Sequence, residues 1–185
     1  MQSGVQSGIS IASRSLAYWA ALVVALSPSL AQAGPRLDLL PQSWTDDLGK
    51  ELKLSELRGR RVILTMAYAS CHYICPMTLD GLLRMQHALD ARGEQASIIV
   101  VGYDPQNDKP SDWHHYRKDH KLGRANWHFL SGSEDVTRDL AGQLGFGFWK
   151  YDEHVMHESR VVVFGADGNI QVALTTPTAE WPAAL

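Results

Sequence analysis

The sequence has little excess charge, few cysteines and no apolar run as long as a typical membrane span. Its 185 residues include 17 Lys and Arg and 20 Asp and Glu, which gives a formal net charge of only −3. So small a negative charge gives no electrostatic reason to expect a nucleic-acid partner. The composition is 45% hydrophobic and 20% charged, without repeats or low-complexity segments, and this balance argues against disorder and against a coiled coil. A chain of this length has room for one domain and a short leader.

The first 33 residues are typical of a secretory leader. Arg14 precedes an apolar stretch over residues 16–26, which is shorter than the roughly 20 residues that a membrane span needs. The sequence Ala31-Gln32-Ala33 then fits the small-x-small pattern of a cleavage site. We therefore expect a signal peptide over residues 1–33 and a mature domain over 34–185. The alternative is an uncleaved anchor in the inner membrane, and both interpretations place the domain in the periplasm.

Strands and helices alternate along the remaining chain. Apolar, β-branched runs predict strands over residues 61–67, 96–101, 127–130, 160–164 and 169–174. Helical spacing and capping residues predict helices over 77–91 after Pro76, from Ser111 as N-cap to about 121, and over 133–144. The turn Asp167-Gly168 joins the last two strands in a hairpin. The pattern predicts an α/β domain with a central mixed β-sheet flanked by helices.

The two cysteines of the chain lie between a predicted strand and a predicted helix. Cys71 and Cys75 are only four residues apart, so a disulfide between them removes little entropy from the unfolded chain and is a poor structural staple. The helix N-terminus stabilises negative charge, and Cys75 should therefore ionise more easily than a free thiol. A thiolate pair can exchange disulfides or hold a soft metal, and three intervening residues favour the metal. A strand, a cysteine pair and a helix start in this order are the arrangement of the thioredoxin group, which predicts a thioredoxin-like fold.

A third ligand is expected for a copper ion between two thiolates. Cu(I) accepts thiolates and imidazole at low coordination number, whereas zinc usually takes four ligands. His157 lies just before the predicted strand 160–164, whose entrance faces the cysteine loop in thioredoxin-like folds. His154 is the rival ligand. Three methionines could serve as soft auxiliary ligands but are expected to be core fillers: Met66, Met77 and Met156.

The segment 68–76, Tyr-Ala-Ser-Cys-His-Tyr-Ile-Cys-Pro, resembles the copper motif of SCO (SenC/PrrC) proteins, in which two cysteines separated by three residues precede a proline. Further elements follow in that family's order: Asp104-Pro105 with Asp108, Trp127 with Phe129, and His157 ten residues before Asp167. The resemblance covers roughly residues 36–174.

The resemblance implies that Cys71, Cys75 and His157 bind one copper ion, as Cu(I) foremost and as Cu(II) in the alternative. It also implies a part in assembling the copper site of a respiratory oxidase, either by delivering the metal or by maintaining that site's thiols. The partners would be a copper-receiving oxidase subunit or another copper chaperone, together with a thiol reductant. The membrane would be met only through an N-terminal anchor.

The sequence departs from that family pattern in two places within the domain. The cysteine motif holds His72, Tyr73 and Ile74 where many relatives have an acidic residue. The tail after residue 174 is short and Pro182 interrupts it, so the C-terminal helix of the family is expected to be short or absent.

Two other functions use the same cysteines. A thiol–disulfide oxidoreductase would need the Cys71–Cys75 pair and no histidine. A thiol peroxidase ranks last, because no residue pattern orients a peroxide beside either cysteine. The first of these is compatible with copper binding, since a disulfide and copper compete for the same sulfurs.

Overall fold

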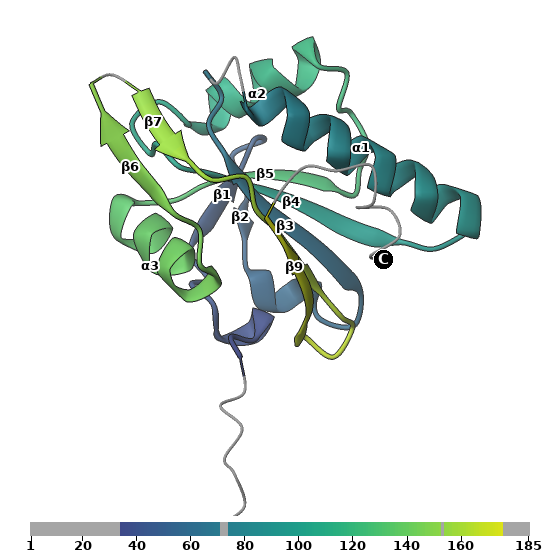
Figure 1. Cartoon of the computed structure of the whole chain (residues 1–185). Helices are drawn as coiled ribbons and strands as arrows, with labels where there is room; N and C mark the ends of the chain where they lie inside the picture. Colours follow the sequence, from purple (N-terminus) through teal and green to yellow (C-terminus); the bar gives the residue numbers. More distant parts are fainter. Residues whose placement is uncertain (1–33, 71–73, 153, 176–185) are drawn as a thin grey trace, which may run out of the picture. The chain divides into compact units, whose positions relative to one another are not determined.

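The computed structural model describes residues 34–70, 74–152 and 154–175 (Figure 1). Its helices are α1 (Ile74–Arg92), α2 (Pro110–Asp119) and α3 (Glu134–Leu144), with short 3-10 turns η1 (Leu37–Leu39) and η2 (Leu54–Leu57). Its strands are β1 (Trp44–Asp46), β2 (Glu51–Leu52), β3 (Arg61–Ala67), β4 (Ala96–Gly102), β5 (Trp127–Ser131), β6 (Phe148–Tyr151), β7 (His154–His157), β8 (Val161–Phe164) and β9 (Ile170–Leu174).

Seven of these strands form one mixed sheet in the order β2-β1-β5-β4-β3-β8-β9. Strands β3, β4 and β5 run parallel, while β8 lies antiparallel to β3 and β1 antiparallel to β5. The two central strands are the apolar runs that predicted them: β4 is buried along its whole length, and β3 is buried from Val62 onward. A strand that is covered on both faces has a continuous apolar sequence, as these two strands do. The predicted α/β domain with a central mixed sheet is confirmed.

Helices cover the sheet on both faces (Figure 1). One hydrophobic core lies between the sheet and the helices α1 and α2, and it includes Leu82 and Met85 of α1 and Trp113 of α2. The second core lies on the opposite face, where Leu140 and Leu144 of α3 pack with residues of η1 and η2.

Two helix boundaries differ from the prediction. Helix α1 begins at Ile74, so Pro76 lies inside its first turn, where the N–H that proline lacks would have no intrahelical partner. Helix α2 begins at Pro110 with Lys109 at the N-cap, so Ser111 is inside the helix and is not its cap. The Asp112 carboxylate accepts a hydrogen bond from the Lys109 backbone N–H at 3.0 Å.

The β6–β7 hairpin was not predicted. It is a two-stranded antiparallel sheet of its own, in which Phe148 pairs with His157 and Trp149 with Met156. The hairpin decides the position of the candidate site, because His157 is its last residue.

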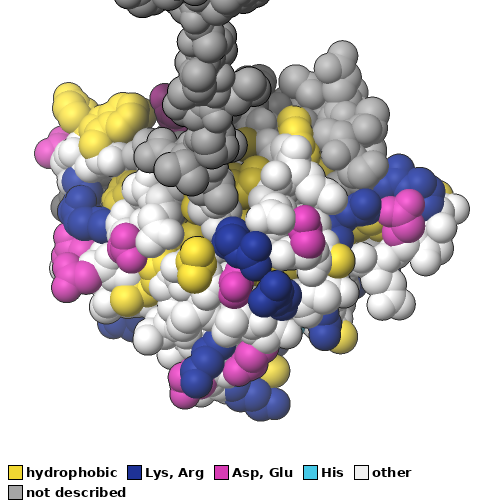
Figure 2. Space-filling model, turned by 90° about the horizontal axis from the view of Figure 1, so that it is seen from below, with side chains coloured by type: hydrophobic (Ala, Val, Ile, Leu, Met, Phe, Trp, Pro, Cys, Tyr) yellow, Lys and Arg dark blue, Asp and Glu magenta, His cyan; other side chains and the backbone are white. Residues whose placement is uncertain are grey.

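On the face that Figure 2 shows, Lys and Arg side chains lie among Asp and Glu side chains, so the described residues of that face form no extended patch of one sign. None of the helices in the described part of the chain has the length and apolarity of a membrane span. The predicted leader and the predicted short C-terminus lie outside the described residues and stay predictions.

Candidate metal centre

The candidate centre lies at the edge of the sheet where the parallel strands β3 and β4 end. Ala67 closes β3 opposite Gly102, the last residue of β4, and Cys71 follows four residues after Ala67 in the sequence. Strand β8 runs the other way and begins at this edge, with Val161 opposite Thr65. His157 lies a few residues before β8, so the topology brings it to this edge. Residues 68–75, here called the cysteine segment, leave the sheet at the same edge.

His157 is buried between two tyrosines that follow the central strands. Its ring is 4.8 Å from the ring of Tyr103, centroid to centroid, and 5.7 Å from the ring of Tyr68, which it meets edge-on at 87°. The residue is 7% exposed. Since Tyr68 is three residues before Cys71, the imidazole contacts the start of the cysteine segment.

The hydrogen bond of the His157 ring specifies its tautomer. The ring atom Nδ1 lies 3.2 Å from the backbone carbonyl oxygen of Glu158, and a carbonyl can only accept, so Nδ1 carries the proton. In the neutral ring the lone pair is then on Nε2. A histidine that ligates a metal usually donates its second ring N–H to a carbonyl or carboxylate in this way, and the donor chemistry of His157 therefore fits a metal ligand.

The two predicted sulfur ligands are only partly covered by the structure. Cys71 lies outside the described residues, and of Cys75 the backbone is described, as the second residue of α1. Among the side chains that are described, no three His, Cys, Asp or Glu residues are grouped to hold a metal ion. The ligand set Cys71, Cys75 and His157 stays a prediction.

Asp108 connects the cysteine segment to the loop that follows β4. Its buried carboxylate accepts hydrogen bonds from the backbone N–H groups of Ala69 and Asp104, both at 2.7 Å. Burial raises the pKa of this carboxyl group to about 7, against the lowering effect of the two hydrogen bonds. The sequence did not predict the link from Asp108 to Ala69, because no local pattern signals a contact between residues 39 positions apart.

The rival ligand His154 is also in β7. It is three residues before His157, and its backbone pairs with Tyr151 of β6. Tyr103 and Tyr68, which enclose the His157 ring, were missed by the sequence reasoning. Their common signal is that each directly follows a buried strand that ends at this edge.

The expectation that all three methionines are core fillers is wrong for two of them. Met66 is buried in β3 at 2% exposure, as expected, but Met77 is 58% and Met156 is 42% exposed. Met156 alternates with the buried residues Val155 and His157, so it falls on the uncovered face of the hairpin. Trp149, its cross-strand partner, is exposed as well.

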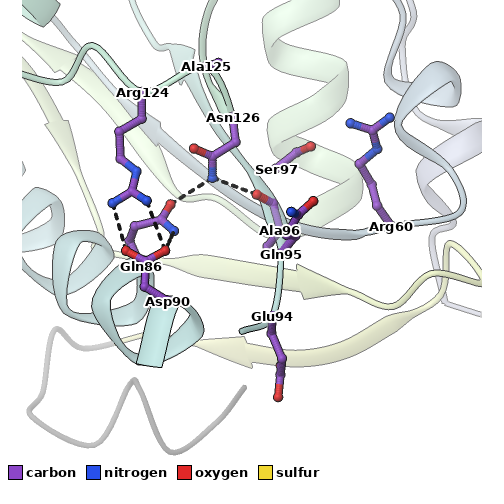
Figure 3. Close-up of a pocket in the computed structure, with 10 residues that line it drawn as sticks. All are labelled: Arg60, Gln86, Asp90, Glu94, Gln95, Ala96, Ser97, Arg124, Ala125 and Asn126. Atoms are coloured by element: carbon purple, nitrogen blue, oxygen red, sulfur yellow. Dashed lines mark hydrogen bonds and ion pairs between the residues drawn. The ribbon is translucent and has the colours of Figure 1, made fainter. Parts of the chain in front are cut away.

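A polar pocket lies at the opposite end of the sheet, where β4 begins (Figure 3). Its volume is about 580 Å³. Arg124 spans its rim to the Asp90 carboxylate with bonds of 2.8 and 3.0 Å, and Asn126 donates to Gln86 and to the Ala96 carbonyl. These charged and polar groups satisfy one another, and His157 does not line this pocket.

Solved structures of similar fold include two proteins with a known link to copper or redox chemistry. Arabidopsis thaliana ScoI, solved with copper bound, is 20% identical, with a TM-score of 0.69 over 77% of this chain and 92% of that one. BsSco, described as a member of the Sco family of cytochrome c oxidase assembly proteins with a disulfide switch, is 23% identical, with a TM-score of 0.68 over 82% of this chain and 95% of that one. At these identities the likeness shows the thioredoxin-like fold of Sco proteins.

Curated relatives and a family model identify the chain more closely. It is 28% identical over 134 residues to the SCO1 protein homolog of Bacillus subtilis, covering 70% of this chain and 69% of that protein. It is also 28% identical over 129 residues to peroxiredoxin-2 of Cricetulus griseus, of which it spans 62%. The family model SCO1/SenC matches residues 40–183, more than three quarters of the sequence. The chain therefore belongs to the SCO1/SenC family.

Proposed function

We propose that this chain is a copper-binding assembly factor that holds one Cu(I) ion through Cys71, Cys75 and His157 and delivers it to a respiratory oxidase copper site. Copper is the cargo: the protein receives it from one partner and releases it to the next. The proposal is supported by the family of the chain and by the copper bound in the related Arabidopsis ScoI structure.

The observation that carries the proposal is the position of His157. A residue that lies 82 positions after Cys75 is buried at the edge where the cysteine segment leaves the sheet. Its ring contacts Tyr68 in that segment, and its Nδ1–H is engaged by the Glu158 carbonyl. This arrangement supports Nε2 as the nitrogen that would meet the metal.

The charge balance of the proposed site suits transfer. Two thiolates and Cu(I) leave one net negative charge, and a neutral imidazole does not change it. Both thiols must lose their protons when copper binds, so loading releases protons to solvent. A soft, low-coordinate ligand set favours Cu(I) over the harder divalent ions that prefer oxygen ligands.

The direct test is an anaerobic Cu(I) titration of the reduced protein against a competing chelator. We expect one Cu(I) per chain and a loss of affinity of at least about tenfold in His157→Ala, since a metal–ligand bond is removed. His154→Ala is the matched control, on the same strand and three residues earlier, and should bind as the unchanged protein does. Equal affinity of the His157 variant would remove His157 from the site, and a loss in the His154 variant instead would assign the third ligand there.

Delivery is tested by mixing the copper-loaded protein with the apo form of the copper domain of an oxidase subunit. Copper should move to that domain, and the Cys75→Ser variant should load copper more weakly and deliver less of it. We infer a periplasmic location from the predicted leader. Cell fractionation with an antibody against residues 34–185 tests that location and the cleavage of residues 1–33.

A second function, thiol–disulfide exchange, is favoured by the placement of Cys75 in the first turn of a 19-residue helix. The amide groups of that turn stabilise a thiolate, and the related BsSco has a disulfide switch. In this reaction the Cys71 and Cys75 thiols are oxidised to a disulfide while a partner disulfide is reduced to two thiols, through a mixed disulfide.

The His157→Ala variant separates the two functions, because exchange needs no imidazole. If this variant still reduces the disulfide of the oxidase copper domain while copper delivery is lost, both functions reside in the same cysteine pair. Consumption of hydrogen peroxide by the reduced protein is the third arm, since a similarity to peroxiredoxin-2 exists. Fast peroxide turnover that survives in His157→Ala would favour a peroxidase over a metal carrier.

A further inference from the structure

A hydroxyl pair joins the helix of Cys75 to the segment of His157. Thr78 Oγ1 and Ser159 Oγ are 2.9 Å apart, although the two residues are 81 positions apart in the sequence. Thr78 is buried near the N-terminus of α1, and Ser159 is half-buried in the connection between β7 and β8. Either hydroxyl can donate and the other accepts.

The positions of these residues relate them to two of the proposed ligands. Thr78 is three residues after Cys75 on α1, and positions three apart are neighbours on the same side of a helix. Ser159 is two residues after His157, a separation of about 7 Å in extended chain. The hydrogen bond thus joins Thr78, about one helical turn after Cys75, to Ser159, two residues after His157.

The same connection is fixed to the rest of the domain by two further contacts. Thr65 Oγ1, on β3, donates to the Arg160 carbonyl at 2.7 Å, and the Glu158 N–H donates to the Gly147 carbonyl at 3.1 Å. These contacts tie residues 158–160 to the sheet and to the start of the hairpin. Among the described residues, the Thr78–Ser159 hydrogen bond ties this connection to α1.

We propose that Thr78 and Ser159 are positioning residues of the metal site, because their hydroxyl pair sets the separation between the Cys75 turn of α1 and His157. This inference rests on the proposed function. Neither hydroxyl is a ligand. Their role is to hold the two parts of the site at the spacing that a three-coordinate copper ion needs, before the metal arrives.

The test compares Thr78→Val, Thr78→Ser, Ser159→Ala and the double variant Thr78→Val with Ser159→Ala. Valine keeps the shape of threonine and removes the hydroxyl, while serine keeps the hydroxyl. We expect Cu(I) affinity to fall about fivefold in Thr78→Val and in Ser159→Ala, the factor that corresponds to about one neutral hydrogen bond. The double variant should be no weaker than either single one, since both remove the same interaction, and Thr78→Ser should bind within about twofold of the unchanged protein.

A second measurement uses the metal-free protein. NMR signals of the His157 ring should broaden or shift in Thr78→Val and in Ser159→Ala, and should be restored in Thr78→Ser. Ser97→Ala is the control for loss of a buried hydroxyl at the far end of β4, and should leave both measurements unchanged.

Two outcomes overturn the proposal. If Thr78→Val lowers the melting temperature while Cu(I) affinity and the His157 signals stay unchanged, the pair only stabilises the fold. If the losses in the two single variants add in the double variant, the two hydroxyls act separately. Failure of the proposed function is distinct from both, because it would appear as unchanged affinity in His157→Ala.

Discussion

The ring of His157 packs on the ring of Tyr103, with centroids 4.8 Å apart and planes inclined by 31°. Tyr103 directly follows β4 of the seven-stranded sheet, whereas His157 is the last residue of the separate β6–β7 hairpin. The imidazole is therefore anchored to the main sheet by its side chain, although its strand forms no ladder with that sheet. Phe148, the hairpin partner of His157, also contacts Tyr103 with ring centroids 5.0 Å apart.

Replacing Tyr103 should reveal how much this ring packing contributes to metal binding. Tyr103→Leu keeps an apolar side chain but removes the ring, and aromatic pairs contribute about 1 kcal/mol beyond the area they bury. We expect Cu(I) affinity to fall about fivefold and the protein to lose about 2 kcal/mol of stability. Tyr103→Phe retains the ring and should keep the affinity within about twofold, measured by the same chelator competition. Equal affinities in the Leu and Phe variants would show that ring contact does not orient the imidazole.

Stability should depend on pH through Asp108. Its pKa is raised from 3.8 to about 7 in the folded protein, so between these values the folded state holds a proton that the unfolded state releases. The stability that Asp108 contributes is fully present below about pH 4, falls as the pH rises to about 7, and is constant above. At about 1.4 kcal/mol for each pH unit, the change is on the order of 4 kcal/mol.

The variant Asp108→Asn removes this titration. Its amide oxygen can accept one of the two N–H bonds, while its amide nitrogen faces the other donor, so the variant should be less stable at low pH. The difference in free energy of unfolding between the two proteins should narrow from pH 4 to 7, as measured by urea denaturation at each pH. A constant difference across that range would contradict the raised pKa.

Gly102 leaves the space that the Asp108 side chain occupies. A Cβ at residue 102 would lie 2.6 Å from the Asp108 Cβ, a contact that the buried backbone of β4 cannot relieve. Gly102→Ala should cost about 1–3 kcal/mol of stability and weaken Cu(I) binding, because it displaces the Asp108 carboxylate from the Ala69 N–H that donates to it. The control is Gly142→Ala in α3, where a Cβ meets nothing within 4 Å and alanine should add about 1 kcal/mol. Thermal melts of the two variants should therefore shift in opposite directions.

Copper affinity should rise with pH, because the ligand thiols must release their protons. At pH values below the pKa of a ligand thiol, the deprotonation of that thiol on binding adds about tenfold in apparent affinity per pH unit. The logarithm of affinity against pH should have a smaller slope in Cys75→Ser, which has one thiol fewer to deprotonate. Parallel slopes at pH values low enough to protonate both thiols would mean that Cys75 is not a ligand.

The central strands could be predicted because their own residues determine them. The runs that form β3 and β4 are apolar and β-branched, and Ser133 caps α3 with its side chain accepting from the Val136 N–H. The β6–β7 hairpin could not be predicted in this way, since its turn lacks the glycine that marks most tight hairpins. Asp152 adopts the left-handed backbone conformation there, with φ of 56°.

The candidate site was predictable only in part for a related reason. His157 stood out by its position before a predicted strand, but its contact with Tyr103 depends on the order of strands in the sheet. The links from Asp108 to Ala69 and from Thr78 to Ser159 connect residues 39 and 81 positions apart. No periodicity in the sequence encodes such pairs, because each becomes a neighbour only when the sheet has formed.

The position of β8 has a consequence for biosynthesis. This strand pairs with β3, although about 95 residues separate their paired positions Thr65 and Val161. A nascent chain that has emerged only as far as residue 150 contains Cys71 and Cys75. It still lacks His157 and the strands β8 and β9 that complete the sheet. Of the three proposed ligands, copper could then bind only the two cysteine thiols. The complete binding site becomes available only after nearly the whole polypeptide has been made.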